Sequence, residues 1–213
     1  MKKYLFSVIF TLFILFPSLS SAHPHSWINM KTNVLIENRQ LIGFKMEWQL
    51  DEIASSELIY EMKISDNESE TREKITQEMV QTAILNHYFS YLYDEQNQPI
   101  KYTTHPKNTY FEITDNRVTF HIHFYLTHPQ QVQDRIFKLF TYEPSYYISM
   151  SYEDENALLI SDSDHLCKLH LNPPNVDTEI QQYAMDLDRT QTPDQDLSLG
   201  AQFAQEVKIV CKK

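Results

Sequence analysis

Histidine is the residue type in this chain best suited to bind a metal ion, and two histidines lie close together near its start. His23 and His25 flank Pro24 and directly follow a segment with the features of an export signal. If that signal were removed after Ala22, the new α-amine would be a nitrogen ligand at neutral pH beside the two imidazoles. Imidazole binds zinc, copper and nickel alike. The sequence therefore predicts an N-terminal metal site, and the alternative is a polar terminus that binds nothing specific.

A second pair of histidines lies in a stretch where apolar and polar residues alternate. Over residues 118–124 the apolar side chains share one face of a predicted strand, and His121 and His123 share the other. Their spacing along the strand is about 7 Å. They could be two metal ligands, half of a site that a neighbouring element completes, or part of a solvated strand face. His87, in contrast, falls on the apolar stripe of a predicted helix, and we expect it in the core.

The first 22 residues have the three parts of a secretory signal. Lys2 and Lys3 precede an apolar run of about a dozen residues, Pro17 ends the run, and small residues lead to Ala22. The run is too short for a membrane helix, which needs about 20 apolar residues. We therefore expect export to the periplasm, cleavage after Ala22, and a mature single domain over residues 23–213 that is not an integral membrane protein.

The composition argues against several classes of function. The net charge of the whole chain is −11, and loss of the two lysines of the signal would make it −13. Such a surface repels nucleic acid and favours cationic partners. The chain has only two glycines, so it lacks a glycine-rich loop for a nucleotide. Hydrolase motifs such as GxSxG and HExxH are also absent, and we do not expect an enzyme.

Cys167 and Cys211 are the two cysteines of the chain. An even number of cysteines in an oxidising compartment favours pairing. A bridge between them would close a loop of about 44 residues and stabilise the fold by about 4 kcal/mol in the chain-entropy model. A metal-binding pair of thiols is the alternative, although the two residues lack the close spacing of a zinc knuckle. We favour the disulfide.

The spacing of apolar residues predicts an α+β fold with an antiparallel sheet. Period two on both sides of a polar turn at 37–40 predicts a hairpin of residues 28–36 and 42–50. Spacings of three and four then predict a short helix over 53–62 and a longer one over 71–88, a helical pair inserted after the first hairpin. The polar, proline-containing stretch 172–198 predicts a surface excursion with a helix near 176–185. The other predicted strands are 89–93, 100–103, 110–113, 118–126, 136–141, 146–152, 166–171 and 205–211.

Three features together resemble the domain of unknown function 1007 family. They are the run His23-Pro-His-Ser-Trp27, the run Tyr142-Glu-Pro-Ser-Tyr-Tyr147 and the late cysteines, and the similarity covers essentially the whole mature chain. Members are often labelled as a periplasmic component of a transport system, often accompany permeases of the nickel/cobalt type, and some are implicated in zinc uptake. The resemblance implies metal acquisition, with His23 and His25 as candidate ligands. Many members carry a glycine-containing acidic loop after the first helix, which this chain lacks.

We therefore expect a binding protein that captures a divalent transition metal and passes it to an inner-membrane permease. Zinc is the first expectation, and nickel or cobalt the second. Two other classes stay open. A chelate by His23 completed by His121 or His123 resembles the copper site of oxidative polysaccharide-cleaving enzymes. A metal-free interaction module of the cell envelope would make the histidines incidental.

Overall fold

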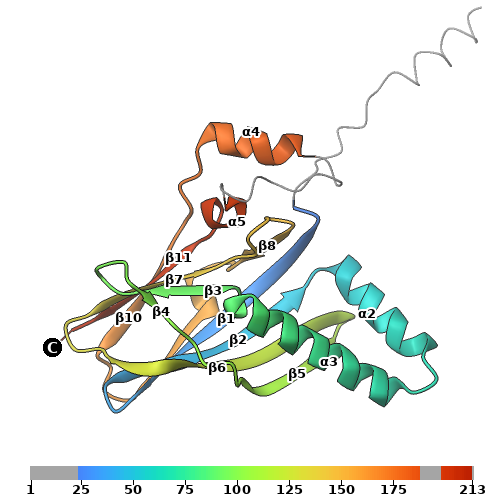
Figure 1. The fold of residues 1–213 in the computed structure, drawn as a ribbon, viewed down its shortest axis with the longest axis horizontal. Coiled ribbons are helices and arrows are strands. Elements are labelled where there is room, and N and C mark those ends of the chain that lie inside the picture. The colour runs from blue at the N-terminus through green and yellow to red at the C-terminus, as the bar shows by residue number, and fades with distance from the viewer. Residues whose placement is uncertain (1–23, 188–197, 213) are drawn as a thin grey trace, which may run out of the picture.

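The computed structural model of the chain describes residues 24–187 and 198–212. The predicted signal peptide over residues 1–22 and the candidate ligand His23 lie outside the described residues, as do residues 188–197 of the predicted excursion. Two β-sheets and two long helices make up most of what is described (Figure 1). Within the described ranges, no helix is both long enough and apolar enough to cross a membrane.

The first hairpin is formed by β1 (Ser26–Glu37) and β2 (Gln40–Leu50). Asn38 and Arg39 connect the strands with φ angles of 49° and 60°, the left-handed conformation that a tight hairpin turn requires. The register places Met30 opposite Trp48, and both side chains are buried. The predicted hairpin with one buried face is confirmed.

The larger sheet has the strand order β5-β6-β2-β1-β8, and β9 also pairs with β1. Its further strands are β5 (Lys107–Thr114), β6 (Arg117–Gln131), β8 (Ile148–Ser151) and β9 (Leu158–Asp162). Most pairs are antiparallel, as predicted, but β8 and β9 both run parallel to β1. The chain enters the smaller sheet before it returns to β1, and such long connections permit parallel pairing.

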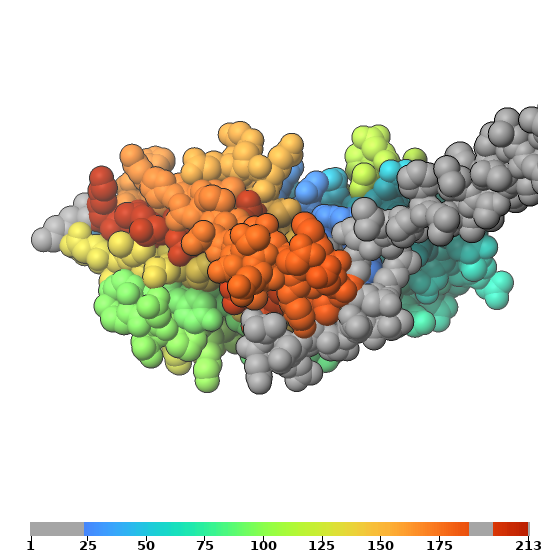
Figure 2. Space-filling model, turned by 90° about the horizontal axis from the view of Figure 1, so that it is seen from above, coloured from blue at the N-terminus to red at the C-terminus, as the bar shows by residue number. Residues whose placement is uncertain are grey.

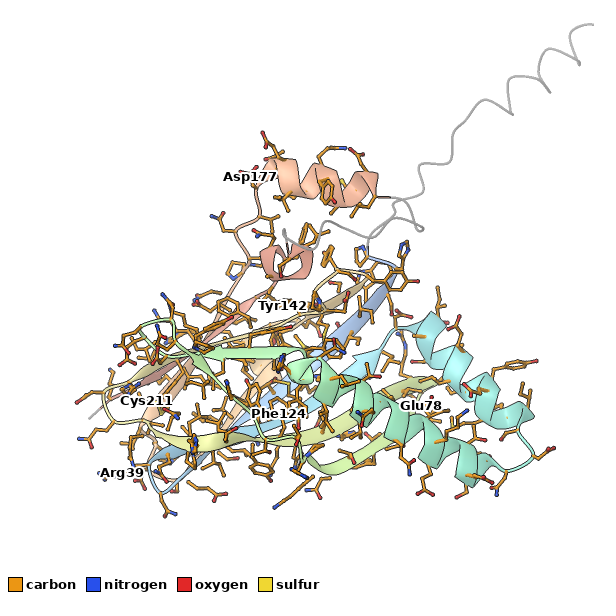
Figure 3. All side chains as sticks on the ribbon, viewed as in Figure 1. Arg39, Glu78, Phe124, Tyr142, Asp177 and Cys211 are labelled. Atoms are coloured by element: carbon orange, nitrogen blue, oxygen red, sulfur yellow. A yellow bond between two sulfur atoms is a disulfide. The ribbon has the colours of Figure 1, made fainter. Side chains whose placement is uncertain are left out.

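The smaller sheet has the order β10-β11-β7-β3-β4 and is antiparallel throughout. Cys167 and Cys211 are directly paired residues at one end of this sheet and form a disulfide (Figure 3). The predicted bridge is confirmed, and so is the α+β class. The strands are β3 (Ser90–Tyr93), β4 (Pro99–Ile100), β7 (Ile136–Thr141), β10 (Cys167–Asn172) and β11 (Glu206–Cys211).

The helical pair consists of α2 (Glu52–Ile64) and α3 (Glu68–Leu85). Met62 of α2 and Ile75 of α3 belong to the same buried cluster as residues of both sheets. Helices and smaller sheet therefore cover the same face of the larger sheet, the face formed by the alternate apolar residues. Among the described residues, no helix or strand covers the opposite face, which carries the polar residues of β1, β2, β5 and β6.

The end of α3 differs from the prediction. The helix stops at Leu85, and His87, Tyr88 and Phe89 follow in the left-handed region with φ angles of 52°, 57° and 50°. This turn buries Tyr88, whose ring stacks on Phe124 with centroids 4.4 Å apart, and leaves His87 exposed. The expectation that His87 is a core residue is wrong, because the chain leaves the helical path before reaching it.

The C-terminal part contains a second, small apolar cluster. The helix predicted near 176–185 is α4 (Thr178–Asp186), whose surface faces the viewer in orange in Figure 2. Ala184 and Leu187 pack with Leu199 of the four-residue helix α5 (Leu199–Gln202), against the partly buried Tyr146 and Phe203. The excursion is thus attached to the domain through the turn that contains Tyr146.

Candidate functional site

His121 lies on the uncovered face of the larger sheet between two carboxylates. Glu47 is its direct partner on β2, with Oε1 3.9 Å from Nδ1. Glu112 reaches it from β5, with Oε1 3.4 Å from Nε2. The ring of Tyr110 stacks on the imidazole at a centroid distance of 4.5 Å, and only 12% of the histidine side chain is exposed. The imidazole is therefore fixed in orientation, with an anionic group near each nitrogen.

The distance between His121 and Glu112 is suitable for sharing a metal ion. Nε2 of His121 is buried and makes no hydrogen bond within the described part of the chain. A tetrahedral zinc with bonds of about 2.0–2.2 Å holds neighbouring ligand atoms about 3.3–3.5 Å apart. The observed 3.4 Å lies in that range. The same geometry would also suit an ion pair if the imidazole were protonated.

His123, two residues along β6, has the opposite surroundings. The register pairs it with Lys45 on β2 and with Lys107 on β5. Burial lowers the pKa of His123, and the neighbouring Lys45 and His121 lower it further. Its Nδ1 lies 3.0 Å from the side-chain amide nitrogen of Asn108. Two lysines repel a cation, so of the two candidate histidines on β6 only His121 has surroundings that favour a metal.

The two carboxylates beside His121 also line a hollow. Its volume is about 400 Å³, and Glu47 and Glu112 share its lining with Glu153 and a single lysine, Lys31. The hollow extends from β5 and β6 across β2 and β1 to Glu153, in the segment after β8. A hydrated cation can therefore approach Glu112 from solvent along an acidic wall. Neither glutamate was predicted as a site residue, because the only signal of each in the sequence is its alternation with apolar residues along its strand.

His25 lies at a different place, where the N-terminal segment is fastened to the domain. Its backbone N–H donates to the carbonyl of Tyr147 at 2.9 Å, and the two rings lie 4.7 Å apart. On the next residues, the Ser26 hydroxyl and the Trp27 N–H donate to Asp51 at 2.6 and 2.8 Å. Asp51 is also the N-cap of α2, since its carboxylate accepts from the Ala54 N–H at 2.9 Å. From His25 onward, the segment that the sequence predicts as a metal site is thus held against the domain by hydrogen bonds.

Glu143 stabilises the turn whose residue Tyr147 contacts His25. Its carboxylate accepts from the N–H and hydroxyl of Ser145 at 3.0 and 2.7 Å and from the N–H of Tyr147 at 2.9 Å. Gly200 packs on the backbone of the same turn, with its N–H donating to Pro144 at 3.0 Å. The two sequence runs on which the family resemblance rests are therefore neighbours in space, each helping to position the other.

The two histidine regions do not form one site. His25 directly precedes β1 and is six residues before Lys31. Lys31 is paired with Glu47, and Glu47 is paired with His121. Six residues of strand span about 20 Å. His121 and His123 therefore do not complete a chelate that includes His25. A copper enzyme built on the N-terminus would need its further nitrogen from elsewhere.

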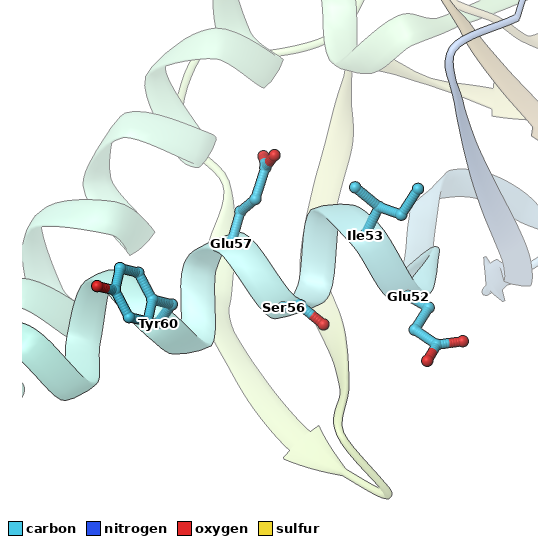
Figure 4. Close-up of a pocket in the computed structure, with 5 residues that line it drawn as sticks. All are labelled: Glu52, Ile53, Ser56, Glu57 and Tyr60. Atoms are coloured by element: carbon cyan, nitrogen blue, oxygen red, sulfur yellow. The ribbon is translucent and has the colours of Figure 1, made fainter.

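Two further observations concern other places in the described chain where a metal could bind. In residues 24–187 and 198–212, no three His, Cys, Asp or Glu side chains are already grouped around one metal position. A shallow hollow on the outer surface of α2 is lined by Glu52, Ile53, Ser56, Glu57 and Tyr60 (Figure 4). It offers carboxylates but neither imidazole nor thiolate, so it suits a transition metal less well than His121 with Glu112.

Comparisons with known proteins match the chain to a family model and to a similar protein. The family model described as "Protein of unknown function (DUF1007)" matches residues 8–211. A Haemophilus influenzae protein described as "Uncharacterized protein" is 42% identical over 212 residues, which cover 100% of both chains. The match thus extends over both sheets, the helical pair and the fastened N-terminal segment.

Proposed function

The chain belongs to the DUF1007 family, and we propose that it is an exported, periplasmic metal-binding accessory protein. It captures a divalent transition metal and passes it to an inner-membrane permease of the nickel/cobalt type. The observation that carries this proposal is the pair formed by His121 Nε2 and Glu112 Oε1, 3.4 Å apart, with the nitrogen buried and without a hydrogen bond in the described part of the chain. Glu47 and the acidic hollow beside it also favour the binding of a cation at this place.

Zinc is the metal that we favour at this pair. Zinc readily accepts an imidazole nitrogen and a carboxylate oxygen as ligands. Nickel or cobalt would bind the same two atoms and more water ligands. Two or three protein ligands leave the other positions to solvent. A protein that delivers its metal needs such an exchangeable site, because a closed four-ligand site releases metal slowly. The net charge of −11 raises the local cation concentration.

The N-terminal histidines are a second candidate site, favoured by the anchoring of His25 against Tyr147. Anchoring removes part of the entropy that a frayed terminus would lose on binding a metal. A site there would use His25 with His23 and the new α-amine, as the sequence predicts. It would be separate from the pair on the larger sheet and could serve a different metal.

Calorimetry on the mature chain with zinc, nickel, cobalt and copper tests the proposal. We expect zinc binding to weaken at least tenfold in Glu112→Gln and in His121→Ala, and to stay unchanged in His123→Ala, the matched control on the same strand. Binding that survives Glu112→Gln but is lost in His25→Ala would move the site to the N-terminus. Copper binding with reductant-dependent oxygen consumption would favour an oxidative enzyme, and no binding by any metal would leave a metal-free interaction module.

A further inference from the structure

A half-open, mainly apolar pocket lies where the end of α3 meets β3 and β4. Its volume is about 420 Å³, within the size range of small-molecule sites. Tyr91, Tyr93 and Tyr102 contribute aromatic surface, and the buried Leu92 lies in its wall. Because α3 and the smaller sheet cover the apolar face of the larger sheet, this pocket is on the opposite side of that sheet from His121.

The ionisable groups of the pocket differ from those of the rest of the chain. The sequence contains 29 acidic residues, yet none is among the described residues that line this pocket. Apart from the tyrosines, its ionisable residues are Lys101 and His87, and both side chains are exposed. A ligand with one negative group is therefore favoured here, whereas a cation is favoured in the hollow beside Glu112.

His87, which lines the pocket, begins the left-handed turn of His87, Tyr88 and Phe89. Each non-glycine residue in this conformation costs about 1–2 kcal/mol, so the turn persists only because other contacts fix it. Tyr88 supplies them: its side chain is 2% exposed and its hydroxyl donates to the carbonyl of Thr103 at 2.6 Å. The turn brings the His87 ring to 6.4 Å from that of Tyr91. Backbone strain of this kind is concentrated at ligand sites.

We propose that this pocket binds a small aromatic anion, with its ring against the tyrosines and its carboxylate or sulfonate near Lys101 and His87. Offset stacking on tyrosine supplies affinity without a fixed partner atom. The positive charge of Lys101 selects against neutral and cationic ligands of the same shape. This site is independent of the metal proposal, because it shares no residue with the His121 region.

Three probes with one ring system test the idea: naphthalene-2-carboxylate, 2-naphthalenemethanol and 2-naphthylmethylammonium. Binding to the mature chain is followed by amide NMR in the presence of a metal chelator, so that the result does not depend on the metal site. We expect the carboxylate to bind most tightly, with shifts confined to residues 87–93 and 99–104. Lys101→Glu should weaken carboxylate binding about tenfold.

The control is Lys168→Glu, the same change of charge at an exposed position on β10, at the other edge of the smaller sheet. It should leave the affinity of the carboxylate unchanged. Equal affinity for the carboxylate and the ammonium probe would overturn the proposal. So would equal losses in Lys101→Glu and Lys168→Glu, shifts spread over the whole surface, or no binding at millimolar concentration.

Discussion

Gly200 lies so close to the carbonyl oxygen of Glu143 that a Cβ atom built on it would be 1.9 Å from that oxygen. The contact joins α5 to the turn that fastens the N-terminal segment. Alanine at position 200 must therefore push the turn away. We expect Gly200→Ala to lower the free energy of unfolding by about 1–3 kcal/mol, measured by urea denaturation. Gln202→Ala, at an exposed position of the same helix, should change it by less than about 0.5 kcal/mol.

Asp51 should make stability depend on pH. Burial raises the pKa of Asp51, but hydrogen bonds from Ser26 and from the N–H groups of Ala54 and Trp27 lower it more, so the net value lies below the ordinary 3.8. A depressed folded pKa stabilises the protein above pH 3.8, and this contribution is lost as pH falls through the folded value. Asp51→Asn should therefore flatten the loss of stability between about pH 5 and pH 2.

The matched change Asp51→Ala also removes the N-cap acceptor of α2. At pH 7 we expect it to cost about 1 kcal/mol, and more if the bonds to Ser26 and Trp27 contribute as well. Urea denaturation across the same pH series separates the two effects. Identical pH profiles for the wild type and Asp51→Asn would show that this carboxylate does not govern acid stability.

The disulfide should be a major source of stability. Cys167 and Cys211 are 44 residues apart in sequence and are direct partners in the smaller sheet. Their joint replacement by alanine should lower the free energy of unfolding by about 4 kcal/mol. Treatment of the wild type with reductant should give a similar loss, and the double variant should not respond to reductant. A response of the double variant would point to a non-specific effect of the reagent.

The left-handed turn predicts a stabilising substitution. His87 is exposed and has φ of 52°, a conformation that glycine adopts without the Cβ penalty. His87→Gly should raise the free energy of unfolding by about 1 kcal/mol. Gln81→Gly, at an exposed position inside α3, should lower it by a similar amount. Opposite signs for the two glycines in denaturation experiments would identify the strained turn, and equal losses would contradict it.

Zinc should stabilise the chain through the His121 pair. A ligand at 100 times its dissociation constant adds about 2.7 kcal/mol to the free energy of unfolding. The thermal midpoint of the wild type should rise with zinc, and that of Glu112→Gln should rise much less. A Glu153→Gln variant serves as the control, since this carboxylate lines the same hollow but is not among the groups that contact His121.

Local patterns were sufficient to predict much of the fold. The hairpin follows from period two on both sides of residues 37–40, and the disulfide follows from two cysteines in a chain that is predicted to be exported. Non-local pairing was not predictable in the same way. Nothing near Ile148 or Leu158 indicates a parallel partner, and nothing near Glu112 indicates His121. The helix was predicted to continue to residue 88, but α3 ends at Leu85 because burial of Tyr88 outweighs the helical preference of its neighbours.

The position of β1 in the larger sheet has a consequence for biogenesis. This strand comes first in the described chain, yet its partners β8 and β9 are complete only at Asp162. Until those residues have emerged, β1 presents a free edge of unpaired N–H and C=O groups. The domain thus completes its larger sheet only after about three quarters of the chain has been made. The same topology makes chains truncated before residue 148 prone to aggregate through that edge.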